Sequence, residues 1–240
     1  WFYYSLHWLM LGLSNSITSG SPSYSAFSIT SISNLEVWLK FNTGQGAITG
    51  GIQWQDQSGN ANDAAQTADV QEGSFSGGAF VTDAGANDNL DFDSQIDLAR
   101  YHVFVVLNLS EQTNEGVLSS TDSSTSFMRL GQGSTTKFRL RHNTSSNQVD
   151  ITLSEAFGTS KAIFEVKRDG SNNVVIAKNG SSIGDASSAA GTFELNQISA
   201  HSNGLSSAEI HEVVVFSNNL PDSDSTLVRN DIATRNSITL

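Results

Sequence analysis

Residues 101–109 read Tyr-His-Val-Phe-Val-Val-Leu-Asn-Leu, a nearly unbroken apolar run rich in β-branched and aromatic side chains. Such side chains favour β-strands, and a run with so little alternation between apolar and polar residues is typical of a strand buried on both faces. We therefore expect residues 101–109 to form a central strand of a β-sheet.

Shorter segments on both sides of this run alternate between apolar and polar residues. In residues 35–41 the odd-numbered side chains are apolar and would share one face of a strand, whereas Trp38 would point to the other face. We expect this strand to be covered on both sides. Further strands are expected in residues 75–81, 89–93, 116–118, 126–130, 137–141, 149–153, 162–168, 174–178 and 209–216.

The C-terminal segment has a helical period instead. Its spacing predicts a short amphipathic helix, with Asp222 or Ser223 as the N-cap and with an apolar face formed by Leu227, Val228, Ile232 and Ala233. About a dozen strands and one terminal helix predict an all-β sandwich over residues 34–240.

The composition excludes several classes of protein. The formal net charge is -12, from 24 acidic and 12 basic residues. Nucleic-acid affinity comes mainly from clustered Lys and Arg, so no DNA or RNA partner is expected. The chain has no cysteine, which rules out disulfides, zinc-thiolate sites and thiol catalysis.

The amino-terminal part differs from the rest. Residues 1–13 are strongly apolar, but they are too short to span a bilayer and lack the basic start of a signal peptide. Two interpretations stay open: residues 1–9 precede a natural start at Met10, or they belong to an apolar arm that docks on a neighbouring subunit. Residues 14–33 are rich in Ser and Thr and predict an extended tether. We therefore expect residues 1–33 to form an arm and tether outside the sandwich.

Six short segments, taken in order, carry a resemblance to a known superfamily. They are Leu-Glu-Val-Trp-Leu at 35–39, Trp-Gln-Asp-Gln-Ser-Gly-Asn at 54–60, the apolar run at 103–109, Lys-Arg-Asp-Gly at 167–170, Lys-Asn-Gly at 178–180, and Ile-His-Glu-Val-Val-Val-Phe at 210–216 continuing to Leu220. Together they resemble the concanavalin-A-like lectin/glucanase superfamily in its laminin-G-like form, over residues 34–236. The resemblance implies a two-sheet antiparallel jelly-roll sandwich that acts as a lectin-like binding module.

A second resemblance rests on the composition and on the segment at 11–18, not on a diagnostic motif. The start Leu-Gly-Leu-Ser-Asn-Ser-Ile-Thr at 11–18 and the Ser/Thr-rich, cysteine-free composition resemble virion structural proteins of marine tailed phages, especially cyanophages. This implies a capsid decoration, head-fibre or tail-associated protein on the virion surface, oligomeric in the assembly. Residues 1–33 would contact other virion proteins of the capsid or tail, and the sandwich would face outward toward cell-surface glycans. The alternative is a secreted carbohydrate-binding module that acts alone.

The sequence predicts no catalytic residues. Glucanases of the superfamily carry Glu-x-Asp-x-x-Glu on one strand, so that the acid and the nucleophile face the sugar. The nearest stretch here offers Glu209 and Glu212, whose spacing of three predicts opposite faces of a strand. His211 is expected to be a structural cross-strand histidine. Gly73-Ser-Phe-Ser-Gly77 has Phe75 where a nucleophile elbow has serine, and it is expected to be a turn. We therefore expect a protein that is not an enzyme.

Two candidate ligand sites remain. Laminin-G-like relatives often bind calcium, and the dense carboxylate and amide side chains near residue 90 predict a calcium site formed by Asp83, Asn87, Asp88, Asp91 and Asp93. The alternative is that these residues only make turns. An aromatic ring beside amides and a carboxylate predicts a sugar site formed by Trp54, Asp56, Asn60 and Asn62. The alternative is that Trp54 plugs the edge of the sandwich.

Overall fold

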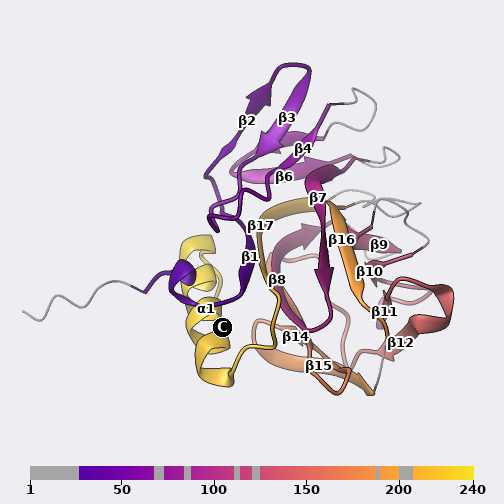
Figure 1. The fold of residues 1–240 in the computed structure, drawn as a ribbon. Coiled ribbons are helices and arrows are strands. Elements are labelled where there is room, and N and C mark those ends of the chain that lie inside the picture. The colour runs from indigo at the N-terminus through magenta and orange to yellow at the C-terminus, as the bar shows by residue number, and fades with distance from the viewer. Residues whose placement is uncertain are drawn as a thin grey trace, which may run out of the picture.

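Two antiparallel sheets face each other across an apolar core, and a helix lies against the outside of one of them (Figure 1). The computed structural model describes residues 27–67, 73–83, 88–110, 114–120, 125–187, 190–199 and 208–240. This architecture confirms the predicted two-sheet antiparallel sandwich with a C-terminal helix. Residues 1–26, which include most of the predicted arm and tether, lie outside the described residues.

The first sheet consists of β1 (Leu35–Leu39), β5 (Ser74–Ser76), β6 (Ala79–Thr82), β8 (Tyr101–Leu109), β13 (Ala162–Arg168), β14 (Asn173–Lys178), β15 (Ser181–Ser187) and β17 (Ala208–Phe216). Their order is β15-β14-β13-β8-β17-β6-β5, and β1 also pairs with β17. The predicted central strand is β8, which lies between β13 and β17. Val103 and Val105 face the core between the sheets, and Phe104 and Val106 face the helix.

The second sheet consists of β2 (Gln45–Ile48), β3 (Gly51–Trp54), β4 (Ala64–Gln66), β7 (Leu90–Leu98), β9 (Glu115–Ser119), β10 (Phe127–Leu130), β11 (Lys137–Arg141), β12 (Gln148–Thr152) and β16 (Phe193–Ile198). Their order is β12-β11-β10-β9-β16-β7-β4-β3-β2. A short 3-10 helix, η2 (Ser145–Asn147), joins β11 to β12.

The helix α1 (Asp222–Asn236) covers the outer face of the first sheet. Its buried side chains Val228 and Ile232 pack against Phe104 and Trp38, so Trp38 is covered on the face opposite the core, as predicted. No helix in the described ranges is long and apolar enough to cross a membrane.

Three details near this helix differ from the sequence predictions. The residue in the N-cap position is Pro221, and it makes no side-chain bond to the helix, so the predicted cap at Asp222 or Ser223 is wrong. Leu227, predicted on the apolar face, is 46 % exposed. Residues 27–33 do not extend as a tether, because Ile29 in the 3-10 helix η1 (Ile29–Ser31) is buried in the cluster beneath α1.

Two buried carboxylates on the sheet bind arginines of the helix. Glu165 on β13 accepts hydrogen bonds from Arg229 Nε at 2.7 Å and Arg229 Nη2 at 2.9 Å. Glu212 on β17 accepts bonds from Arg235 Nη2 at 2.9 Å, Asn236 Nδ2 at 2.6 Å and Trp38 Nε1 at 2.8 Å. Because both carboxylates are almost completely buried, these bonds fix where the helix sits on the sheet.

The two ends of the sandwich are closed differently. At one end the last strands of the two sheets, β12 and β15, contact each other. At the other end the last strands are β2 and β5, and the hairpin of β2 and β3 projects at the top of the molecule in Figure 1. This second end carries the most distinctive surface of the protein.

Candidate functional site

The end formed by β2, β3, β5 and β6 consists of residues 41–55 and 73–82, which we call the open end. The two hairpins are joined by hydrogen bonds to Gly78: Gln45 Nε2 donates to its carbonyl at 2.8 Å, and Asn42 N donates to the same oxygen at 3.4 Å. Gly78 has φ +83°, and a Cβ there would lie 2.8 Å from the Phe41 ring. Only glycine therefore allows this close approach.

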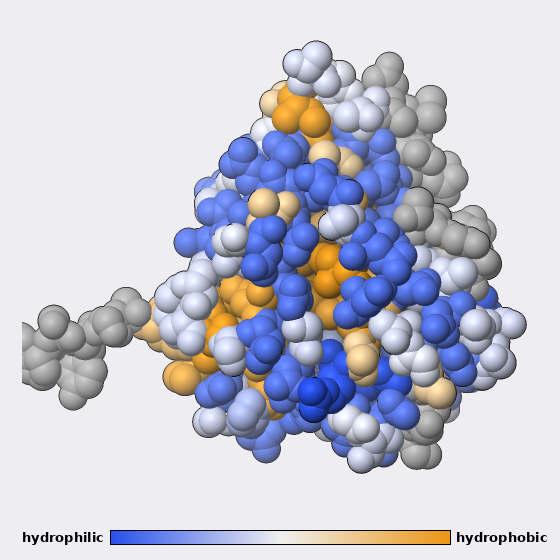
Figure 2. All heavy atoms as spheres, in the orientation of Figure 1, coloured by the Kyte–Doolittle hydropathy of each residue, from blue (hydrophilic) through white to orange (hydrophobic). Residues whose placement is uncertain are grey.

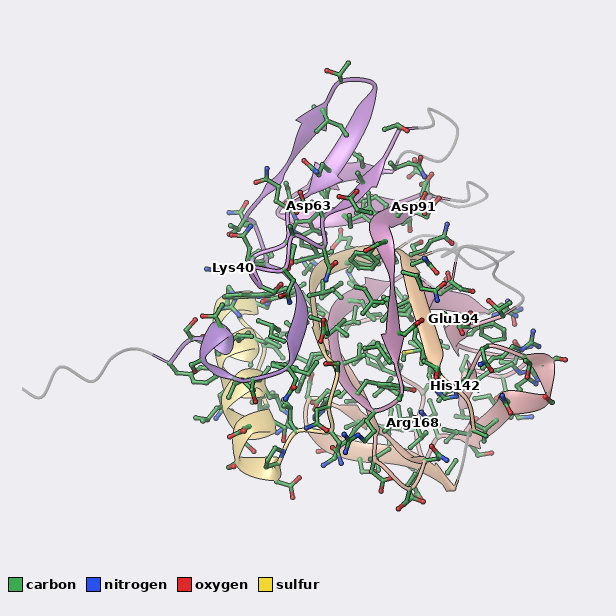
Figure 3. The ribbon with its side chains drawn as sticks, viewed as in Figure 1. Lys40, Asp63, Asp91, His142, Arg168 and Glu194 are labelled. Atoms are coloured by element: carbon green, nitrogen blue, oxygen red, sulfur yellow. The ribbon has the colours of Figure 1, made fainter. Side chains whose placement is uncertain are left out.

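The open end contains no charged residue, although the whole chain carries 36 of them and a net charge of -12. Its side chains are amides, hydroxyls, small residues and a few aromatic and aliphatic groups. The labelled charged side chains Lys40, Asp63 and Asp91 lie away from the tip of the β2–β3 hairpin, toward the body of the sandwich (Figure 3). A neutral surface of this size on an acidic protein is suited to a ligand or partner without charge.

A hollow of about 250 Å³ lies between the two edge strands. It is lined by Asn42, Gly44, Gln45, Phe75, Ser76, Gly77 and Gly78. Phe75 is partly exposed in it and packs edge-on against Trp54, with ring centroids 5.9 Å apart. The hollow therefore offers an aromatic ring, two amide side chains and the backbone groups of three glycines.

Trp54 lies behind this hollow and not in it. Its side chain is fully buried, and its Nε1 donates to the carbonyls of Lys40 at 3.2 Å and Thr43 at 3.0 Å. The prediction that Trp54 forms an exposed sugar platform is therefore wrong, and the alternative that it plugs the sandwich edge describes its position. Its ring packs against Phe75, which is the partly exposed aromatic side chain in the hollow.

The other predicted sugar-site residues brace the first strand. Asp56 Oδ1 accepts bonds from Trp38 N at 2.8 Å and Ser58 N at 2.9 Å. Asn60 Nδ2 donates to the Leu35 carbonyl at 2.6 Å, and Asn62 Nδ2 donates to the Glu36 carbonyl at 2.9 Å. The Asp56 carboxylate and these amide nitrogens make bonds inside the loop and along β1, and sugar binding by these three residues stays a prediction.

Phe75 was missed because its segment was misinterpreted. The predicted turn at Gly73–Gly77 is wrong: Ser74–Ser76 is strand β5, and the turn is Gly77-Gly78, where φ is +58° and +83°. The single strand predicted at 75–81 is likewise two strands, β5 and β6. A Gly-Gly pair between short apolar segments is itself a hairpin signal, and it could have placed Phe75 correctly.

The residues of the predicted calcium site are only partly described. Asp88 Oδ2 accepts a bond from Asp83 N at 2.7 Å, as in a turn. Asp91 Oδ1 accepts bonds from Asn89 Nδ2 at 2.7 Å and Gln197 Nε2 at 2.6 Å. Asn87 lies outside the described residues, and within the described ranges no three acidic or imidazole side chains gather as a metal site. Asp93 is exposed on β7, and calcium binding stays a prediction.

Glu209 and Glu212 lie on the same face of β17, so the prediction of opposite faces is wrong. The register with β8 shifts between Ile210 and Glu212, which marks a β-bulge, and Ile210 and Val213 both face the core as a result. Glu212 is nevertheless fully buried beneath α1, whereas Glu209 is exposed. The two carboxylates therefore share no solvent-filled site.

His211 lies in this bulge beside the open end. Its Nε2 is 3.3 Å from Glu209 Oε2, and its ring centroid is 5.8 Å from that of Phe41. Burial and the nearby Lys161 lower the pKa of His211, and they outweigh the effect of Glu209. The packed imidazole fits the predicted structural role.

Comparisons with known proteins find likeness in structure alone. No family model matches the chain, and no curated protein matches its sequence. Among solved structures, the binding domain of Botulinum Neurotoxin DC in complex with SialylT has a TM-score of 0.58 at 12% identity, over 85% of this chain and 52% of that one. The binding domain of Paraclostridial Mosquitocidal Protein 1 has a TM-score of 0.60 at 12% identity, over 85% and 53%.

A third neighbour is a botulinum neurotoxin type C structure concerned with cell entry through interaction with two ganglioside molecules. Its TM-score is 0.53 at 16% identity, over 85% of this chain and 52% of that one. The chain thus spans about half the length of these neighbours, and identities this low establish the fold alone. The chain is therefore a two-sheet antiparallel β-sandwich whose fold is similar to that found in the binding domains of these toxins.

Proposed function

We propose that this chain is a non-enzymatic binding module that holds an uncharged segment of a cell-surface glycan at its open end. The observation that carries the proposal is the hollow between β2 and β5, where a partly exposed Phe75 lies beside amide side chains in a surface without charge. Amides both donate and accept hydrogen bonds, which suits sugar hydroxyls, and an aromatic ring offers an apolar face to sugar carbons. One neighbouring binding domain in complex with SialylT, and another from a toxin whose cell entry depends on interaction with two ganglioside molecules, add support by fold alone.

The size of the hollow fits a short part of a glycan. At about 250 Å³ it is smaller than most pockets that enclose a drug-sized ligand. A single site of this kind would bind weakly, so many copies displayed together would be needed for firm attachment. This requirement favours a virion surface protein, tied to capsid or tail by its amino-terminal segment, over the alternative of a secreted module acting alone.

A glycan array with the purified chain tests the binding proposal. We expect retention by neutral oligosaccharides, and we expect Phe75→Ala and Asn42→Asp to lose at least about tenfold in affinity. Val149→Ala, a partly buried side chain packed on the core from β12 at the opposite end, serves as the matched control and should bind normally. Failure of the unaltered chain to bind any glycan, or unchanged binding by both folded open-end variants, would overturn the proposal.

A truncation separates the virion role from the secreted alternative. The deletion should remove residues 1–26 only, because Ile29 is buried beneath α1 and its loss would damage the sandwich. We expect the truncated chain to keep its glycan binding and to be lost from purified particles. Normal incorporation into particles would contradict attachment through this segment.

A further inference from the structure

The edge strand β2 leaves part of its backbone unused by its own sheet. It pairs with β3 in the register Gln45↔Trp54, Gly46↔Gln53, Ala47↔Ile52 and Ile48↔Gly51, and Gln55 N donates to the Gly44 carbonyl at 2.8 Å. In an antiparallel pair, directly hydrogen-bonded positions alternate with positions whose N–H and C=O point away from the partner strand. Gly44 and Gly46 therefore bond to β3, and the backbone groups of Gln45 and Ala47 point outward.

Edge strands of natural proteins are commonly protected against pairing with another chain. The usual devices are charged side chains, proline, bulges or a covering segment. The sequence of β2, Gln-Gly-Ala-Ile, has neither charge nor proline, and its pairing with β3 has no register shift. Residues 46–50 are exposed, and Figure 2 shows an apolar patch at the tip of the hairpin, where Ile48 is 37 % exposed.

The strand is complementary to itself in one antiparallel register. With Gly46 opposite Gly46 of a second copy, each Gln45 faces the Ala47 of the other chain. The outward backbone groups of these residues then exchange four hydrogen bonds. The space beside Gly46 is open to a second strand, because a Cβ built on Gly46 meets nothing within 4 Å.

The same register places an apolar side chain over a hollow. Gly44, Gly46 and Ile48 share one face of the hairpin with Gln53 and Gln55, by the period of two and the pairing register. These residues line a hollow of about 190 Å³. Ile48 of each copy lies opposite Gly44 of the other, so its side chain can enter the partner's hollow. The contact is isologous, since both copies use the same surface.

We propose that this protein forms a two-fold dimer in which β2 pairs antiparallel with β2 of a second copy, centred on Gly46. The occupant is a second copy and not an unrelated strand because the register uses every outward backbone group and matches Ile48 to the hollow over Gly44. The lack of charge in residues 41–55 matters as well, since two chains of net charge -12 repel least where neither carries a charge.

The dimer and the proposed glycan site can be tested separately, although Gly44 and Gln45 line both hollows. Ile48 lines only the hollow used in pairing, and Asn42 and Phe75 line only the glycan hollow. Ile48→Asp should abolish the dimer and keep weak glycan binding. Asn42→Asp should keep the dimer and lose glycan binding. A failure of one proposal is therefore distinguishable from a failure of the other.

Disulfide trapping tests the register directly, because the chain has no cysteine of its own. Opposed residues at a position without direct hydrogen bonds have Cα atoms about 4.5 Å apart, within the range that a disulfide spans. We expect Gly46→Cys to give a covalent dimer on mild oxidation. Thr49→Cys is the matched control, since its two copies would lie about 20 Å apart in this register. Equal cross-linking of the two variants, or none by either, would overturn the proposal.

Sedimentation velocity of the full chain gives a second, non-covalent test. We expect the unaltered chain to dimerise with rising concentration up to about 1 mM, and Ala47→Pro to stay monomeric over the same range. Proline at this position removes only an outward N–H, so its urea unfolding midpoint should match that of the Ala47→Ser control. A monomer at every concentration, or dimerisation of folded Ala47→Pro equal to that of Ala47→Ser, would count against β2 pairing.

Discussion

The face of the first sheet beneath α1 contains buried charged residues, whereas the open end contains none. Beneath the helix, Glu165 and Glu212 are buried and each is bonded to an arginine of α1. At the open end, residues 41–55 and 73–82 carry no charge, although many of them are exposed. Charge is thus used inside this molecule to attach one element to another, and a neutral surface is left where we propose that other molecules bind.

This comparison predicts that stability depends most on the buried carboxylates. Glu212→Ala would leave Arg235, Asn236 and the Trp38 indole without their shared acceptor in a buried region. Removing one partner of a buried ion pair typically costs about 3–5 kcal/mol of unfolding free energy. Urea unfolding followed by tryptophan fluorescence would measure the loss.

Glu155→Ala is the control for this substitution. Glu155 is an exposed carboxylate with Lys178 4.0 Å away, and removing it should change stability by less than about 0.5 kcal/mol. If Glu212→Ala cost no more than Glu155→Ala, the helix would not be held by its buried charges and the comparison would fail.

A substitution of the second carboxylate, Glu165, should cost less stability than Glu212→Ala. A glutamine at this position still offers one oxygen to Arg229. Burial alone would raise the pKa of Glu165, but the bonds with His102 and Arg229 outweigh burial and hold that pKa below its usual range. Glu165→Gln retains the shape and one acceptor oxygen for Arg229. We expect a loss of about 2–3 kcal/mol.

The lowered pKa of Glu165 also has a pH signature. The ionised carboxylate stabilises the fold above the unfolded-state pKa, and this contribution is lost as pH falls through the folded-state pKa. Unfolding measured at pH 7 and at pH 4 would therefore show a smaller difference for Glu165→Gln than for the unaltered chain. An identical difference would contradict the ion pair.

The sandwich itself could be predicted from particular segments. β8 was recognisable because burial on both faces removes polar residues from the sequence. β5 and β6 were not, since strands of three and four residues are too short to display a period of two. The bulge in β17 could not be predicted either, because it arises from pairing with β8 and does not change the spacing of the apolar residues in the sequence.

The sequence predicted where the candidate site lies, but it did not predict which residues line its surface. Trp54 directed attention to the open end of the sandwich, where we propose the site. The burial of the Trp54 side chain, however, depends on Phe75, which comes from the other sheet. It also depends on the carbonyls of Lys40 and Thr43, which accept the indole N–H. Such contacts between sheets are set by the fold as a whole, and the sequence near Trp54 does not contain them.

A buried histidine gives the third prediction, again away from the open end. Burial and the nearby Arg168 lower the pKa of His142 to about 3, and its Nε2 lies 3.0 Å from the Tyr101 hydroxyl. A folded-state pKa below the unfolded value near 6.5 means that the unfolded chain binds the proton first as pH falls. This residue should therefore remove about 2 kcal/mol of stability between pH 8 and pH 5.

His142→Gln isolates this contribution. The variant is expected to be less stable at pH 8, but its stability should fall less steeply between pH 8 and pH 5 than that of the unaltered chain. Urea unfolding midpoints across this range provide the measurement. Parallel pH profiles for the two proteins would mean that His142 does not titrate as its burial implies.

The smallest expected effect on stability completes the comparison. Asn42 is exposed at the open end with φ +51°, a left-handed conformation that Asp also tolerates. Asn42→Asp should therefore change the unfolding free energy by less than about 0.5 kcal/mol, while it places a negative charge beside the hollow of Phe75. If glycan binding falls in Asn42→Asp while stability holds, and stability falls in Glu212→Ala while its folded fraction binds normally, the two regions have separate tasks. Loss of binding in both folded variants would mean that the helix-covered face takes part in recognition. The buried charges would then do more than hold the helix on the sheet, and the comparison would fail.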